Sequence, residues 1–232
     1  MKFLSRWSKT LLLAGTLTFA SMVSLPSQVW ALTQEQVVET LGVMPIFFVL
    51  SQNNQLVFIT TEQGEQVSPR FISRDAAQAF LNSLAQSNPQ LSQQARIAAL
   101  PLGELYRLDN EQSNRQEVDF AYLSLEDGQF YETPLFYATV GDDSVTLTQN
   151  GEQVIPFFFD QASMNQMIER FKQAQPNLAS QVQVKAVPLE GFIQTLQTSN
   201  DRSLTQIQLV LPPESIEFVR SVQQQMQQQP RQ

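Results

Sequence analysis

The chain has 232 residues, of which 14 are basic and 22 are acidic, and it contains neither cysteine nor histidine. The net charge of −8 argues against nucleic acid and anionic lipid as main partners, because both need a basic face. The missing residue types remove the thiolate nucleophile, the commonest general base and the commonest metal ligand. About 200 residues can bury a sizeable core in one or two domains, and this core must form without disulfides.

Residues 1–31 have the three parts of a cleavable secretory signal peptide. Three basic residues precede an apolar run over 11–23, and Val29 and Ala31 occupy the −3 and −1 positions of a cleavage site. The alternative is an uncleaved anchor, but the run is short for a membrane span. Cleavage leaves 11 basic and 22 acidic residues from Leu32 onward, a formal charge of −11. We therefore expect an exported protein with no membrane span after cleavage, and the lack of cysteine favours a bacterial or organellar envelope compartment.

The mature sequence contains an internal repeat. Residues 64–108 align with residues 151–195 without a gap at an offset of 87 positions, and 13 of these 45 positions are identical. A fixed register of this length predicts a duplicated unit. We interpret the chain as two similar lobes, residues 32–125 and 126–232, related by pseudo-twofold symmetry. The second lobe ends in a C-terminal helix and a glutamine-rich tail.

Each lobe is predicted to begin with strands. The segments 45–50 and 134–140 are rich in aromatic and β-branched residues, and a polar turn and a second alternating strand follow each of them. Asn150-Gly151 is a strong signal for a two-residue hairpin turn. Ser73 and Asp160 then stand at the N-cap position of two helices, each with apolar residues at i, i+3, i+4 and i+7 along one face.

The remaining elements repeat in the same order. Each lobe continues with a short strand, at 96–100 in the first lobe and 182–187 in the second. A short helix that starts at a proline, Pro101 or Pro188, follows this strand. A closing strand ends the unit, at 118–125 or 204–211. A last helix begins at residues 212–213 and is predicted to turn Ile216, Val219 and Val222 inward. Short turns between the early strands indicate an α+β fold with antiparallel sheets packed against amphipathic helices. By symmetry with the last helix, a longer helix would be expected at 126–132, but Asp127-Gly128 and an aromatic pair stand there instead.

No catalytic motif is present, and we predict no catalytic residue, metal ligand or cofactor. Glu65 and Glu152 are the one pair of carboxylates that the repeat preserves, and a pair could support glycoside hydrolysis. The repeat assigns them to separate lobes, so nothing in the sequence places the two carboxylates about 5–10 Å apart, as this chemistry needs. Asp142-Asp143 lacks the alternating carboxylates and glycine of a calcium loop and is interpreted as turn chemistry.

The repeat also suggests where a partner binds. Ser68 and Arg70 in the first lobe correspond to Ile155 and Phe157 in the second, on alternate residues that share one face of a strand. If the polar pair faces solvent, Ile155 and Phe157 form an exposed apolar patch of the kind that marks interaction sites. The alternative is that the C-terminal helix buries this face of the second lobe.

Several segments together resemble the Tic22 family. They are the Val-x-Pro-[Ile/Leu]-Phe-[Phe/Tyr] strand opening, the Gly-Glu-Gln-Val-x-Pro-x-Phe hairpin exit, the Pro-Leu helix starts and the closing Ile-Gln-Leu-Val-Leu-Pro-x-x-Ser-Ile-Glu-Phe segment. The resemblance covers nearly the whole mature chain. It rests on a pattern of hydrophobic segments and not on a catalytic motif.

The resemblance implies a non-enzymatic, chaperone-like factor of protein transport. Its expected partners are unfolded or precursor proteins and, in cyanobacteria, the POTRA domains of the outer-membrane barrel-assembly protein. The bacterial-style signal peptide favours the cyanobacterial branch, a role in outer-membrane biogenesis and a periplasmic location, with the thylakoid lumen or an organellar intermembrane space as alternatives. The alternative function is a periplasmic carrier of a small apolar ligand, which would enclose its ligand in a pocket with a few convergent polar groups.

Overall fold

The computed structural model describes residues 32–60, 64, 66–112, 119–126 and 129–228. The expected signal peptide lies outside this part of the chain. The helices are α1 (Gln34–Leu41), α2 (Arg74–Ser87), α3 (Pro89–Gln94), α4 (Leu102–Gln112), α5 (Gln161–Ala174), α6 (Leu189–Thr198) and α7 (Pro213–Gln228). The strands are β1 (Pro45–Leu50), β2 (Ile59–Thr60), β3 (Gln66–Phe71), β4 (Arg96–Pro101), β5 (Asp119–Glu126), β6 (Gln129–Glu132), β7 (Pro134–Val140), β8 (Asp143–Ser144), β9 (Leu147–Gln149), β10 (Glu152–Phe158), β11 (Val182–Pro188) and β12 (Ile207–Val210). The predicted α+β class is confirmed.

The strands form two sheets with matching order. The first sheet runs β4-β1-β3-β5-β6, with β2 beside β3, and the second runs β11-β7-β10-β12, with β8 and β9 beside β7 and β10. The registers also match: Pro45 pairs with Pro101 in the first sheet, and Pro134 pairs with Pro188 in the second. The aligned halves of the sequence therefore occupy corresponding strands. A gene duplication as the origin of this correspondence stays a prediction.

Most neighbouring strands pair antiparallel, as expected, but each sheet also contains one parallel pair and is therefore mixed. The closing strand of each half runs parallel to its neighbour, with Arg70 opposite Tyr122 in β3 and β5, and Phe157 opposite Leu209 in β10 and β12. The connection from β3 to β5 contains α2, α3, β4 and α4. A crossover of this length lets the chain return in the same direction, which a tight hairpin cannot do.

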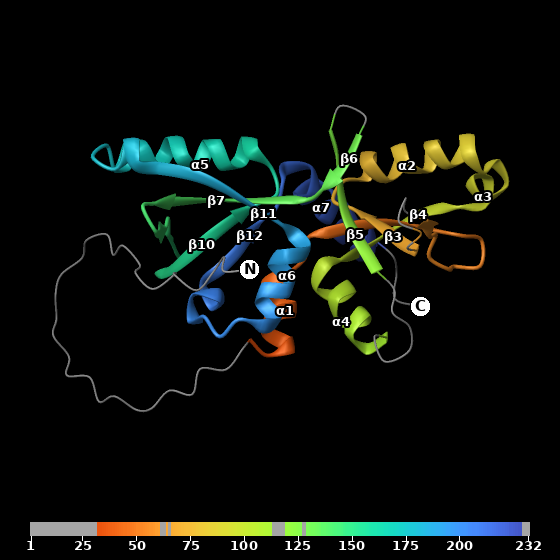
Figure 1. Ribbon diagram of the computed structural model, residues 1–232, viewed down its shortest axis with the longest axis horizontal. Helices are drawn as coiled ribbons and strands as arrows, with labels where there is room; N and C mark the ends of the chain where they lie inside the picture. The colour runs from red at the N-terminus through yellow and green to blue at the C-terminus, as the bar shows by residue number, and fades with distance from the viewer. Residues whose placement is uncertain (1–31, 61–63, 65, 113–118, 127–128, 229–232) are drawn as a thin grey trace.

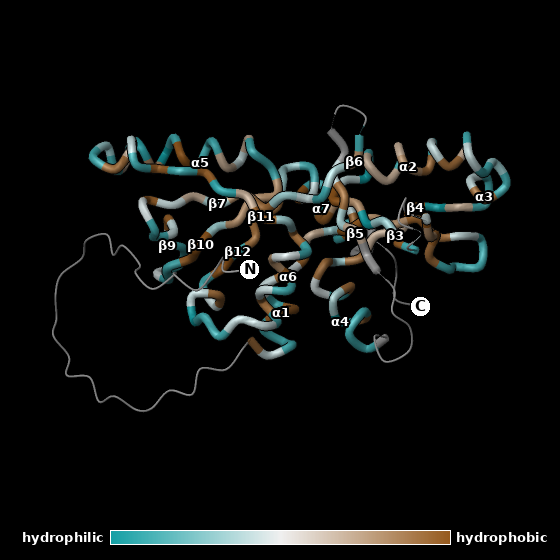
Figure 2. Tube along the Cα trace, in the orientation of Figure 1, coloured by the Kyte–Doolittle hydropathy of each residue, from teal (hydrophilic) through white to brown (hydrophobic). Residues whose placement is uncertain are grey.

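Helices α2 and α5 cover the outer faces of the two sheets, at opposite ends of the elongated molecule (Figure 1). Both predicted N-caps are present: the N–H of Ala76 donates to Oγ of Ser73 at 3.1 Å, and the N–H of Ser163 donates to Oδ1 of Asp160 at 2.7 Å. Apolar and polar residues alternate along both helices in Figure 2, which is typical of helices with one buried face. Each helix closes a small apolar cluster with the sheet beneath it.

The inner faces of both sheets share one core with α1, α4 and α6, which lie together on the opposite side from α2 and α5 (Figure 1). Its fully buried side chains come from both halves of the chain, among them Leu41, Met44, Ile46, Leu102, Leu135, Phe157, Leu189 and Leu196. The halves are thus joined by apolar packing as well as by the chain. The boundary between residues 125 and 126 stays a prediction.

Three details differ from the expected elements. Pro101 and Pro188 end strands, and the helices begin one residue later. Residues Gln129–Glu132 form the strand β6 on β5, where symmetry would have given a helix. Ile216 is 38% exposed, and the neighbouring Phe218 makes the contact instead. The Asn150-Gly151 hairpin turn is confirmed, with positive φ angles of 53° and 87° that suit a type I′ turn.

Packing of α1 on α4 depends on a glycine. A Cβ atom on Gly103 would lie 2.4 Å from the carbonyl oxygen of Val38 and 3.2 Å from that of Gly42. Gly103→Ala is therefore expected to push α1 away and to destabilise the protein by about 2 kcal/mol or more. Gly191 in α6 is the control, because a Cβ there meets nothing within 4 Å. Gly191→Ala should stabilise the protein by about 0.5–1 kcal/mol. If urea unfolding gave both variants the same change in stability, the close approach of α1 to Gly103 would be contradicted.

Candidate binding site

The predicted patch of Ile155 and Phe157 is buried, so the expectation of an exposed apolar surface there is wrong. Ile155 is 3% exposed and Phe157 is 1% exposed. The ring of Phe157 stacks on Tyr137 at a centroid distance of 4.9 Å and lies 5.1 Å from Phe192 of α6. This face of β10 belongs to the core that the two sheets share, and α6 contributes to its cover in place of the C-terminal helix.

The premise that Ser68 and Arg70 face solvent also fails, because both are buried. The guanidinium of Arg70 donates to both carboxylate oxygens of Asp109, at 2.6 and 2.7 Å, and to the hydroxyl of Tyr122 at 2.9 Å. Burial alone would lower the pKa of Arg70, but the hydrogen bond and charge of Asp109, with help from Tyr122, raise it. Burial raises the pKa of Tyr122. A paired arginine can thus occupy a core position, so its presence did not indicate exposure.

The second half replaces this polar cluster with an apolar one. The positions 87 residues after Arg70, Asp109 and Tyr122 hold Phe157, Leu196 and Leu209. All three of these apolar side chains are buried in the shared core. Corresponding positions of the two halves are therefore filled differently, by a buried ion pair in the first half and by apolar side chains in the second. Neither cluster forms the exposed apolar patch that the sequence predicts.

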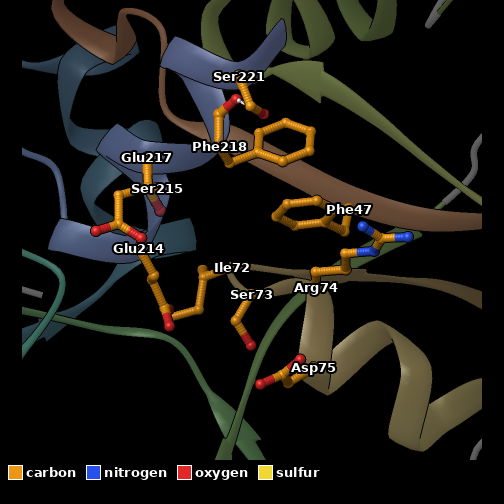
Figure 3. A pocket seen from close by; sticks show the side chains of 10 residues that line it. All are labelled: Phe47, Ile72, Ser73, Arg74, Asp75, Glu214, Ser215, Glu217, Phe218 and Ser221. Carbon is orange, nitrogen blue, oxygen red and sulfur yellow. Dashed lines mark hydrogen bonds between the residues drawn. The ribbon is translucent and has the colours of Figure 1, made fainter.

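The structure has a surface hollow at another place, between the start of α2 and the helix α7 (Figure 3). The hollow has a volume of ≈ 380 Å³. Phe218 of α7 meets Phe47 of β1 with their rings in an edge arrangement at 5.0 Å, and Ile72 lies nearby. Arg74, Asp75, Glu214 and Glu217 are exposed around it, as drawn in Figure 3. The hollow thus combines an aromatic wall with a predominantly acidic rim.

Negative charge accumulates beside this hollow. The pKa of Glu214 is raised, first by burial of part of its side chain and then by the charges of Asp75 and Asp160. Asp75 lies in the first turn of α2, Asp160 caps α5, and Glu214 lies in the first turn of α7. Three helix starts therefore bring carboxylates within electrostatic range of one another. An apolar segment with basic residues has the charge and character that suit this hollow.

Glu214 has a predictable effect on stability. Because its pKa is raised on folding, the folded state binds this proton more tightly than the unfolded state, and the stability gained by protonation is lost as the pH rises through the folded pKa. Glu214→Gln is therefore expected to stabilise the protein at neutral pH, by under about 1 kcal/mol because the group is largely solvated. The gain should shrink at acidic pH and in high salt in thermal unfolding. Glu152→Gln removes an exposed carboxylate elsewhere on the protein. If it stabilised the protein as much as Glu214→Gln, the surroundings of Glu214 would not be the cause of the gain.

A second hollow, of ≈ 450 Å³, lies between α1 and β12. From the α1 side it is lined by residues that include Leu32, Glu39 and Val43, and from the strand side by residues that include Leu209 and Leu211. Val43 is 59% exposed, the most exposed of the large apolar side chains described. Neither hollow is predicted by the sequence. Each forms between elements from different halves of the chain, so no local pattern indicates it.

Of the carboxylates considered for catalysis or metal binding, the described ones lie on different elements. Glu65 lies outside the described residues, and Glu152 is exposed at the start of β10. Asp142 lies in the turn after β7, as predicted, and Asp143 begins β8. In the described part of the chain, no group of three or more carboxylates could hold a metal ion. None of the described helices combines the length and the apolar character needed to cross a membrane.

Comparison with known proteins identifies the family. A family model described as the Tic22-like family matches residues 3–227. No match was found among curated proteins. Among solved structures, Anabaena Tic22, described with the words protein transport, is 23% identical with a TM-score of 0.66, over 82% of this chain and 97% of that chain. Tic22 from Plasmodium falciparum is 20% identical with a TM-score of 0.56, over 82% and 98%. These two structures share the fold, and because the family model spans nearly the whole sequence, the chain belongs to the Tic22-like family.

Proposed function

We propose that this chain is a protein-transport factor that acts by binding non-native segments of exported proteins, without catalysing a reaction. The observation that carries the proposal is membership of the Tic22-like family, together with the similar structure described as protein transport. The exported form operates in the periplasm and supports outer-membrane biogenesis. Its partners are unfolded or precursor proteins and the POTRA domains of the outer-membrane barrel-assembly protein.

The hollow between α2 and α7 suits such a client. Its aromatic wall offers apolar contact, and its acidic rim favours segments that also carry lysine or arginine. Half of its lining residues are exposed. A client segment can therefore enter without the protein having to open. Contacts of this size give weak binding, which suits a factor that must release its client.

The proposal is tested with a denatured enzyme as client. Citrate synthase unfolded in guanidinium is diluted into buffer with the exported protein, and its aggregation is followed by light scattering. We expect aggregation to fall as the protein approaches a few-fold excess over the client. No suppression at tenfold excess, or saturable binding of one fluorescent fatty acid in its place, would contradict the proposal and favour a small-ligand carrier.

A charge reversal tests the hollow itself. Glu217→Lys changes an exposed rim residue, and Glu152→Lys makes the same change at an exposed position on β10. Glu217→Lys is expected to weaken the binding of a basic, apolar client peptide about three- to tenfold, while Glu152→Lys leaves binding within twofold. Equal losses would assign the effect to net charge and not to the hollow.

A further inference from the structure

The last strand of the second sheet, β12, lacks a neighbour that its counterpart in the first sheet possesses. Strand β5 is joined on its outer side by β6, which pairs antiparallel with it from Leu123 opposite Glu132 to Glu126 opposite Gln129. The described part of the second sheet ends at β12. The first sheet therefore shows that a strand in this position of the fold can accept a further strand.

The backbone groups of β12 that face outward can be identified from β5. The carbonyl of Leu123 accepts from the N–H of Ile72 on the inner side, and the carbonyl of Tyr122 accepts from the N–H of Thr133, at 2.8 Å, on the outer side. Leu209 occupies the place of Tyr122, because both strands have the same register with their inner neighbours. Since backbone groups alternate along a strand, the N–H and C=O of Leu209 face outward.

Two observations agree with this assignment. The N–H of Ile207, two residues before Leu209, donates to the carbonyl of Leu204 and not to β10. Among the described residues, no backbone hydrogen bond joins the outward groups of Leu209 to another segment. A strand edge of this kind can pair with an incoming chain.

The hollow between α1 and β12 lies along this edge. Ile207, Leu209 and Leu211 line it together with α1, and the exposed Val43 stands on its far side. The other outer strands of the sheets, β4, β6 and β11, contribute no residue to either hollow. Strand β11 also carries Lys185, a residue type that discourages pairing at an edge. Of these outer strands, β12 alone lines one of the two hollows, and the lining there combines apolar side chains with polar ones such as Thr40 and Gln208.

Pro212 and Pro213 limit how much of this edge can be used. Proline has no N–H, so the ladder cannot continue beyond Leu211. In the first sheet the corresponding residues Leu125 and Glu126 continue the pairing with β6. An added strand on β12 therefore makes only a few backbone hydrogen bonds, which favours short-lived binding.

We propose that β12 accepts an extended segment of a non-native protein as an additional strand, with side chains of that segment entering the hollow beside α1. This mode of binding needs no particular side-chain sequence in the client, since the backbone supplies the hydrogen bonds. It rests on the proposed function and adds a second site to it. The occupant is an extended polypeptide segment, and a second copy of this chain is an alternative that the test distinguishes.

The test uses a defined peptide and its backbone-methylated forms. The probe is a fluorescein-labelled nonapeptide in which valine and threonine alternate between two lysines, and binding to the exported protein is followed by fluorescence anisotropy. In a strand, amides of alternate residues face the same side. One form is N-methylated at the valines and the other at the threonines. One form should lose at least tenfold in affinity, while the other stays within about threefold of the unmodified peptide. Equal binding or equal loss of both forms would overturn the proposal.

Protein variants locate the peptide. Val43→Arg fills the hollow beside β12, and Val184→Arg makes the same change at an exposed position on β11, the opposite edge strand of the same sheet. Both positions are exposed, so both variants are expected to fold, which circular dichroism verifies. Val43→Arg should weaken the peptide at least tenfold, and Val184→Arg less than twofold. Equal effects would overturn the assignment to β12.

Two further outcomes separate the proposals. If sedimentation shows a dimer that Val43→Arg dissociates, the edge binds a second copy and the client strand is refuted. If the peptide fails to bind while the protein still suppresses aggregation of citrate synthase, the strand proposal falls and the proposed function stands. If the peptide fails to bind and aggregation of citrate synthase is not suppressed, both proposals fall.

Discussion

Asp109→Leu is expected to lower the free energy of unfolding by about 3 kcal/mol, the low end of the range for breaking a buried ion pair. Arg70 is 2% exposed, and Asp109 holds it through two short hydrogen bonds. Removing the carboxylate leaves the guanidinium in the core without its main counter-charge. Both tryptophans, Trp7 and Trp30, lie in the expected signal peptide, so urea unfolding of residues 32–232 is best followed by far-ultraviolet circular dichroism.

The second half of the chain supplies the control for this change. Arg70→Phe, Asp109→Leu and Tyr122→Leu together install the residues that stand 87 positions later. The triple variant is expected to recover most of the loss and to come within about 1–2 kcal/mol of the original protein, because replacing a whole buried ion pair by hydrocarbon is often neutral or stabilising. A triple variant that loses as much as the sum of its single changes would contradict the equivalence of the two clusters.

Phe157→Ala is expected to cost about 3–5 kcal/mol, the range for removing a fully buried aromatic ring. Phe157 is 1% exposed and contacts the rings of Tyr137 and Phe192. Its truncation leaves a cavity where β7, β10 and α6 meet. The measurement is urea unfolding, with the slope compared between variants so that a change in the unfolded state is recognised.

Phe58→Ala is the matched control for the loss of an aromatic ring. Phe58 is 40% exposed, so its truncation should change stability by under about 1 kcal/mol. If Phe157→Ala lowered the free energy of unfolding by less than about 1 kcal/mol, Phe157 would have to be exposed, as the patch suggested by the repeat requires. Unchanged client binding by the folded Phe157 variant would agree with its place in the core.

The sequence alone determined the local elements of this protein, because each depends on residues close together in the chain. The N-caps at Ser73 and Asp160, the positive φ turn at Asn150-Gly151 and the apolar faces of α2 and α5 all follow from spacing and side-chain chemistry. The offset of 87 residues also identified which strands correspond, since the repeated pattern specifies the same registers in both sheets.

Only the tertiary structure decided which faces are buried and where the surface is hollow. In the sequence, Arg70 suggests a strand face exposed to solvent, but its partner Asp109 lies 39 residues away and on another element. The parallel direction of β5 and β12 depends on how long crossovers pack, and α7 reaches Phe47 of the opposite sheet. Burial is a property of contacts between distant segments, so a local pattern can indicate that a face is apolar without indicating which element covers it.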